Sequence, residues 1–296
     1  MEAGQRAGGK GAGAPAGGVG SGPIEAAAPV HHACPIDPAC RFCNGTAAAD
    51  DFDWSFAGAA YCISLQHRDD RAAAAAAEFH RVGLCRHVTF YRPTRHPGSA
   101  VAGIWNSHRH VVRRAAKQGR ARVLVFEDDV QISRRLRPGT LRRIAAAVEG
   151  LPPDWTLFFL GHWPLWAYPV GRRLLRVGSA CAHAYIGSTR LMDWFDSTRS
   201  RKDADYTRLA GKGVDAAYAA LPGAYAWFPM VAIQSASKSD HITWEAGRPR
   251  RKLKHLVTYS RHRERLLSGL MPLSQYVVLA LAPFSWLRHG PRARRG

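Results

Sequence analysis

Three consecutive acids, Glu127-Asp128-Asp129, end a run of apolar residues from Val123 to Phe126. A run this rich in β-branched and aromatic side chains is typical of a buried strand. Since charged groups are almost never buried without a partner, the acids indicate an open cleft, a bound cation or both. In open α/β sheets, ligands bind beyond the carboxyl ends of the strands, where these acids would lie. A solvated junction between strand and loop is the alternative.

The acids are suitable ligands for a hard divalent cation, since carboxylate oxygens favour magnesium or manganese over softer metals. If the alternation of the strand continues through them, Glu127 and Asp129 face one side and Asp128 the other.

The elements around the acids alternate between strand and helix. Strands are predicted over 59–65, 87–91, 121–126 and 155–160, and helices over 68–84, 104–117 and 139–149. An aromatic loop over 162–168, one or two strands over 173–186, helices over 188–196 and 213–220, and a last strand over 224–233 follow. This order predicts an α/β fold with a Rossmann-like, doubly wound, open and mostly parallel sheet flanked by helices.

Composition divides the chain into four parts. Residues 1–29 form a Gly/Ala-rich leader expected to be disordered, 30–53 a cysteine-containing linker, 54–247 the main domain, and 248–296 a basic and apolar extension. The extension combines clustered cations with an apolar stretch that Pro272 and Pro283 interrupt. It suits either an interfacial segment on an anionic membrane or a helix that packs back on the domain.

Cys34, Cys40 and Cys43 lie close together in the linker, beside His31 and His32. Thiolates and imidazoles bind zinc in sets of four, but this spacing is not a standard four-ligand pattern, and a redox pair or ordinary loop cysteines are alternatives. The first residues do not have the pattern of a secretory signal peptide, so a cytoplasmic location is expected, with peripheral membrane contact through the extension.

Several short motifs occur in a fixed order. Leu65 precedes Arg68, Ser107-His108 lies in the next helix, and Glu127-Asp128-Asp129 ends the central strand. Leu160-Gly161, Ala184-Tyr185-Ile186, Val214-Asp215 and Ser239-Asp240 follow. Across residues 58–241 this series resembles glycosyltransferase family 25, the lipooligosaccharide and procollagen-type galactosyltransferases. Ser64 departs from the family pattern, which usually has asparagine there.

The resemblance implies a GT-A-like fold and the metal-dependent transfer of a hexose, galactose or glucose, from a UDP-sugar to a hydroxyl of a glycan or glycoconjugate, with inversion, as in lipopolysaccharide biosynthesis. In this interpretation Mn2+ or Mg2+ binds Asp129, aided by Glu127 with Asp128 close by, and Asp215 is the catalytic base. The expected substrate-binding residues are Arg68 and Arg71, on the diphosphate, and Ser107, His108, Trp163, Tyr185 and Asp240; His241 is a speculative further metal ligand.

Two other functions stay open. The formal net charge of +20 suits a nucleic-acid-binding protein, but its cations concentrate after residue 247 without a recognition motif, so no specific nucleic acid is expected. The second open function is that of a catalytically inactive relative that serves as a binding module.

Overall fold

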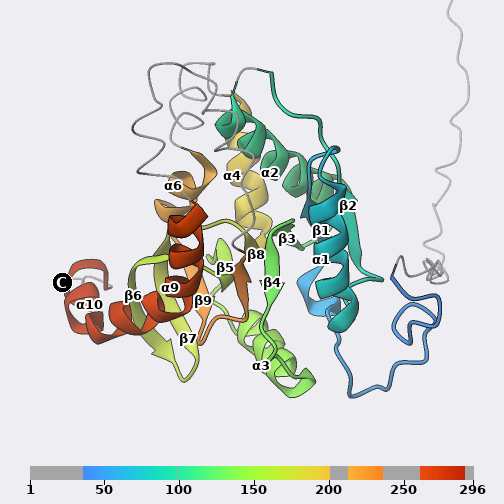
Figure 1. Ribbon diagram of the computed structural model, residues 1–296. Coiled ribbons are helices and arrows are strands. Elements are labelled where there is room, and N and C mark those ends of the chain that lie inside the picture. The colour runs from blue at the N-terminus through green and yellow to red at the C-terminus, as the bar shows by residue number, and fades with distance from the viewer. Residues whose placement is uncertain (1–35, 98, 201–212, 236–260, 291–296) are drawn as a thin grey trace, which may run out of the picture. The chain divides into compact units, whose positions relative to one another are not determined.

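The computed structural model describes residues 36–97, 99–200, 213–235 and 261–290. Its centre is an eight-stranded sheet in the order β2-β1-β3-β8-β5-β9-β7-β6 (Figure 1). The strands are β1 (Ala59–Ile63), β2 (Val88–Tyr91), β3 (Arg122–Glu127), β5 (Leu157–Gly161), β6 (Pro164–Gly171), β7 (Leu174–Ser179), β8 (Ala184–Ser188) and β9 (Ala224–Trp227). Every strand of this sheet except β7 and β8 points the same way. The α/β class and the mostly parallel sheet are confirmed.

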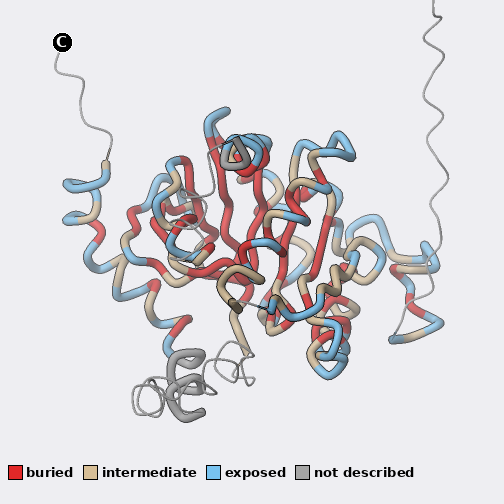
Figure 2. Tube along the Cα trace, turned by 90° about the horizontal axis from the view of Figure 1, so that it is seen from above, coloured by how far each residue is buried: buried red, intermediate tan, exposed pale blue. Residues whose placement is uncertain are grey.

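Helices cover both faces of the sheet. The helices are α1 (Asp69–Arg81), α2 (Ala100–Lys117), α3 (Pro138–Glu149), α4 (Thr189–Ser200), α6 (Gly213–Ala219), α9 (Arg261–Ala280) and α10 (Ala282–His289), and Ser55–Ala57 is a 3-10 turn. Side chains of α1 and α3 pack in one apolar cluster with the sheet, and those of α2, α4 and α6 pack in another. Figure 2 shows buried residues concentrated in the strands between them.

Strand β3 shows how the apolar run becomes the centre of the fold. Leu124 and Phe126 belong to the cluster on one face, and Val123 and Val125 to the cluster on the other. All four are fully buried, which is why the run is apolar without alternation. The strand ends at Glu127, which pairs with Ile63 at the end of β1.

The predicted alternation through the three acids is wrong. Asp128 and Asp129 form a turn after β3, and the chain leaves the main sheet. It continues as β4 (Val130–Ile132), which pairs with β10 (Ala232–Gln234) in a separate two-stranded sheet. The turn breaks the strand's period of two, so it allows all three acids to face one cavity.

Two other elements differ from the predictions. Much of the predicted aromatic loop over 162–168 is the strand β6, which pairs along β7. The predicted strand over 224–233 is two strands in different sheets, β9 and β10, with a cis peptide bond at Phe228-Pro229 between them.

The described part of the C-terminal extension packs on the domain. Met271 and Gln275 of α9 are buried, and the Gln275 side chain accepts a hydrogen bond of 3.0 Å from the backbone of Met230. Within the described ranges no single helix has the length and apolarity to cross a membrane; Leu270–Ala280 and Ala282–His289 meet those criteria only as a pair bent by 70°.

Candidate functional site

A cavity of about 300 Å³ opens at the carboxyl ends of β1, β2 and β3. These three strands are parallel, so their carboxyl ends meet at one edge of the sheet. Open α/β sheets bind their ligands at this edge. The cavity brings together seven of the residues singled out from the sequence: Arg71, Ser107, His108, Glu127, Asp128, Asp129 and Asp215. These residues come from two helices, one strand, a turn and the short helix α6.

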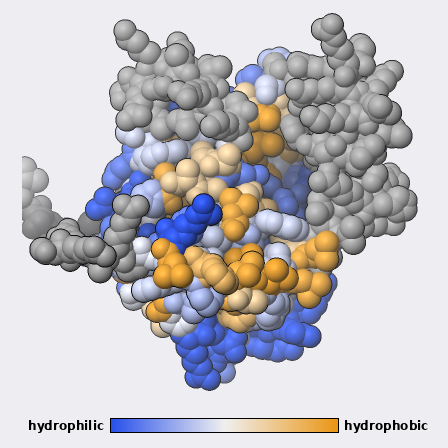
Figure 3. Space-filling model, turned by 90° about the vertical axis from the view of Figure 1, so that its left-hand side faces the viewer, coloured by the Kyte–Doolittle hydropathy of each residue, from blue (hydrophilic) through white to orange (hydrophobic). Residues whose placement is uncertain are grey.

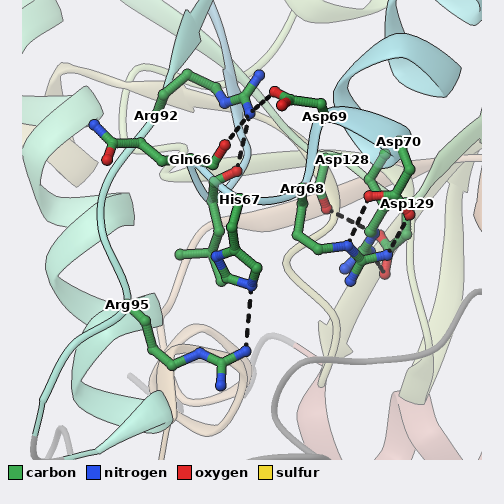
Figure 4. Close-up of polar contacts among 11 residues, drawn as sticks. Gln66, His67, Arg68, Asp69, Asp70, Arg92, Arg95, Asp128 and Asp129 are labelled. Carbon is green, nitrogen blue, oxygen red and sulfur yellow. Dashed lines mark hydrogen bonds and ion pairs between the residues drawn. The ribbon is translucent and has the colours of Figure 1, made fainter.

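Arg71 joins the first turn of α1 to Asp128 and Asp129, the two aspartates labelled in Figure 4. Its guanidinium forms ion pairs with Asp128, at 3.0 Å, and with Asp129, at 2.6 Å. The three side chains are 11%, 8% and 16% exposed. Two neighbouring carboxylates therefore share one cation in a nearly dry setting.

Burial disfavours the ionised form of both aspartates. It raises the pKa of Asp129 to about 7, with Glu127 and Asp128 adding to the effect and Arg71 opposing it. Burial also raises the pKa of Asp128, again against the charge of Arg71. Oδ1 of Asp129 is buried and has no hydrogen-bond partner within the described structure. An oxygen of this kind is placed to bind a cation.

The donor set fits a hard divalent cation such as magnesium or manganese. Apart from the sulfur-containing group described below, the described residues contain no three ligand atoms already converging on one point, and Arg71 holds an oxygen of each aspartate. Such a cation does not need a full set of protein ligands. It usually keeps several waters and binds one or two carboxylates together with phosphate oxygens of a ligand. Asp129, through Oδ1, and Glu127 can provide those carboxylates.

His108 of α2 connects Glu127 to two buried tyrosines. Its Nε2 lies 3.2 Å from Oε1 of Glu127, and its Nδ1 lies 3.0 Å from the hydroxyl of Tyr185, which lies 2.8 Å from that of Tyr218. His108 therefore bridges Glu127 and Tyr185 through its two ring nitrogens. Burial opposes ionisation of Glu127, but the hydrogen bond and charge of His108 outweigh it and lower the pKa. Glu127 is the acid kept charged.

Asp215 faces the cavity from the first turn of α6. The buried Val214 anchors this turn, while the Asp215 side chain is exposed to the cavity. Its concave surroundings desolvate the carboxylate, and with the charge of Glu127 this raises the pKa to about 7 against a hydrogen bond with Ala182. A carboxylate with this pKa takes up and releases a proton near neutral pH.

The loop after β2 also lines the cavity, through Thr94, Arg95 and His96, and the sequence analysis missed it. It follows a third parallel strand to the same edge, which is the signal that could have found it. The start of α2 completes this wall, with Ser99 as its N-cap. A Cβ at Gly103 would lie 3.0 Å from that of His96, so glycine lets the loop lie close to the helix.

Three predicted substrate-binding residues lie elsewhere, and a fourth is outside the described residues. Arg68 pairs through two nitrogens with Asp70, at 2.8 and 2.9 Å, and is not part of the cavity wall (Figure 4). Trp163 packs against an apolar cluster of Cys181, Met230 and Met271. Tyr185 is fully buried behind His108, so its contact with a substrate is indirect. Asp240, like His241, lies outside the described residues.

Comparisons with known proteins find only distant structural likeness. No protein-family profile and no curated protein sequence matches the chain. A glycosyltransferase involved in glycosylation of the major capsid of PBCV-1 aligns at 11% identity and a TM-score of 0.32, over 49% of this chain and 66% of its own, just under two thirds. Mannose-1-phosphate geranyltransferase from Thermus thermophilus aligns at 12% identity and a TM-score of 0.35, over 57% and 72%. Likeness this low carries no information about function.

Proposed function

We propose that the protein is a metal-dependent glycosyltransferase that moves a hexose, galactose or glucose, from a UDP-sugar to a hydroxyl of a glycan or glycoconjugate. The observation that carries the proposal is the buried, unpartnered Oδ1 of Asp129 beside the ionised Glu127 in one cavity. The sequence resemblance to glycosyltransferase family 25 supports the same activity, because its Glu-Asp-Asp, Ser-His and Val-Asp motifs all contribute to this cavity.

The wall opposite the acids suits a diphosphate. The first two turns of α2 line the cavity, near the positive N-terminal end of the helix, and Arg95 adds a guanidinium. Asp129 and Glu127 would hold Mn2+ or Mg2+, which supplies Lewis-acid stabilisation to the departing UDP. In this proposal Arg71 holds Asp128 and Asp129 in position beside the metal, and its guanidinium is paired with these acids and not with the phosphates.

Asp215 is the base in this proposal. The acceptor oxygen attacks the anomeric carbon as the bond from that carbon to UDP breaks, and the hydroxyl proton passes to the Asp215 carboxylate. Attack on the side opposite UDP inverts the anomeric centre. A pKa of about 7 makes the carboxylate basic enough to accept this proton and acidic enough to be ionised at neutral pH.

The experiment measures UDP release from UDP-galactose and UDP-glucose with manganese or EDTA. We expect the wild-type protein to release UDP with manganese and not with EDTA. Asp129→Asn and Asp215→Asn should lose this turnover. Asp70→Asn is the matched control, because its side chain is 67% exposed and outside the cavity wall. Undiminished turnover by Asp129→Asn would contradict the metal assignment. Metal-dependent nucleotide binding without turnover of any donor would instead identify an inactive binding module.

We also propose that the C-terminal helices contact an anionic membrane surface. Figure 3 views the side that carries α9 and α10 and shows apolar side chains gathered on it. Among the residues whose burial is described, the large exposed apolar side chains of the two helices and of the residue between them are Leu270, Leu273, Tyr276, Val277, Leu281, Phe284, Trp286 and Leu287. Arg288 and His289 end the second helix. Apolar side chains next to cations favour an anionic interface.

Sedimentation with vesicles tests this membrane proposal. We expect the protein to sediment with vesicles that contain phosphatidylglycerol and to stay in solution with pure phosphatidylcholine. Phe284→Ser and Leu287→Ser, at side chains 72% and 76% exposed, should weaken the binding. Equal sedimentation of the wild type and both variants would contradict it.

A further inference from the structure

Three thiols and an imidazole gather at a second place, where the segment before the domain meets the end of α1. Cys40 and Cys43 lie in one turn, His80 in the last turn of α1, and Cys85 in the loop that leads to β2. One ligand atom each of Cys40, His80 and Cys85 lies within 4.8 Å of the other two. The sulfur of Cys85 is 3.7 Å from that of Cys40 and 3.4 Å from that of Cys43.

These separations are close to those of thiolates on a shared zinc ion. Tetrahedral zinc with zinc–sulfur bonds of about 2.3 Å holds two sulfurs about 3.8 Å apart. The five cysteines that the structure describes form no disulfide with one another. Cys40, His80 and Cys85 therefore have the ligand types and nearly the spacing of a zinc site, and Cys43, in contact with Cys85, is the fourth candidate ligand.

The backbone brings the thiols of Cys40 and Cys43 to one place. Hydrogen bonds from the N–H groups of Cys43 and Asn44 to the carbonyl of Cys40, at 3.1 and 2.9 Å, fold the turn that carries both residues.

Thiols this close bind together as thiolates only when a cation offsets their negative charge. Zinc supplies that charge, and the thiol protons are released as the metal binds.

The segment that carries Cys40 contacts the domain through few side chains. Phe52 packs against the main core. Arg86 and Arg142 donate hydrogen bonds to backbone carbonyls of the segment. The buried apolar cluster of the segment consists of Cys40 and Phe42, with a few partly buried neighbours. Phe42 lies against Gly83, where the backbone has a φ of +69° and a Cβ would come within 2.9 Å of the ring. A cluster this small rarely fixes a segment without a covalent or metal link.

We propose that Cys40, Cys43, Cys85 and His80 bind a structural zinc ion that fastens the segment 36–53 to the end of α1. The site is separate from the acidic cavity and does not depend on the proposed transferase activity. The zinc ion would stabilise α1, the helix whose first turn carries Arg71. Loss of zinc should therefore lower the stability of the folded protein.

The test uses the full chain, expressed with zinc and purified without chelators. We expect about one zinc ion per chain by mass spectrometry of the metal, and a cobalt-substituted protein with strong thiolate-to-cobalt absorption. A chelator should remove the metal and lower the melting temperature. The cobalt spectrum separates this site from the acidic cavity, whose oxygen ligands give no such band.

Variants assign the ligands. Cys85→Ser and His80→Ala should lose the zinc and the thiolate band, while Cys62→Ala keeps both, since Cys62 is buried in the main core. If a variant does not fold, the cobalt titration of the wild-type protein still decides. A folded wild-type chain that gains no thiolate band, zinc retained in full by Cys85→Ser, or a disulfide within the group would overturn the proposal.

Discussion

Replacing Arg71 with methionine tests whether one guanidinium allows two buried carboxylates to lie side by side. Methionine keeps much of the length and apolar volume of the side chain but removes the ion pairs to Asp128 and Asp129. Removing one partner of a buried pair typically costs about 3–5 kcal/mol, because the remaining charge is left uncompensated. The side chains are 11%, 8% and 16% exposed, so solvent screens this pair weakly.

The loss of stability should depend on pH. The pKa of Asp129, about 7 in the folded protein, lies above its ordinary 3.8, so wild-type stability falls as the pH rises between these values. Arg71 lowers the pKa of both aspartates, and without it their folded-state values rise further. The variant should therefore keep losing stability above pH 7, by up to about 1.4 kcal/mol per pH unit for each proton that the folded state retains.

The assay is urea unfolding followed by circular dichroism near pH 6 and pH 8.5, with EDTA present. Arg134→Met is the control, because Arg134 is 74% exposed in its ion pair with Glu78, and such pairs contribute less than about 1 kcal/mol. A loss below about 1 kcal/mol for Arg71→Met at the higher pH, or the same loss at both pH values, would refute the reasoning.

Three further predictions concern single side chains. Asp215→Asn should raise the melting temperature relative to wild type more near pH 8 than near pH 5, because the raised folded-state pKa of about 7 makes the ionised form costly above that pH; a constant difference would contradict it. Tyr218→Phe should lower the free energy of unfolding in urea by about 1–3 kcal/mol, because the buried hydroxyl of Tyr185 loses one hydrogen-bond partner. The control Tyr276→Phe, at a side chain 53% exposed, should change it very little. Gly178→Ala should cost about 1–3 kcal/mol, because the new Cβ would overlap the Trp166 indole on the neighbouring strand; an unchanged unfolding midpoint would contradict it.

The order of elements and the edge that holds the acids could be predicted from the sequence, because both depend on local patterns. The four apolar residues of β3 are buried on both faces, and that burial leaves an unbroken apolar run in the sequence. The turn at Asp128 and Asp129 could not be predicted, because the three-residue strand β4 after it is too short to show a period and pairs with β10 about a hundred residues later.

The roles of single residues depended on contacts that spacing does not encode. Arg68 and Arg71 both lie at the start of α1, but Arg71 pairs with the buried Asp128 and Asp129 whereas Arg68 pairs with the exposed Asp70. Tyr185 lies in a motif associated with substrate binding, yet its strand pairs on both sides and buries the side chain. Cys85 follows Cys40 by 45 residues, so their closeness appears only in the folded chain.

Anomalous diffraction from crystals grown with manganese and UDP tests the central claim most directly. We predict a manganese peak within coordination distance of Asp129 and Glu127, with the diphosphate between that ion and the start of α2. A manganese ion or a nucleotide bound elsewhere on the chain, with this cavity holding only solvent, would contradict it.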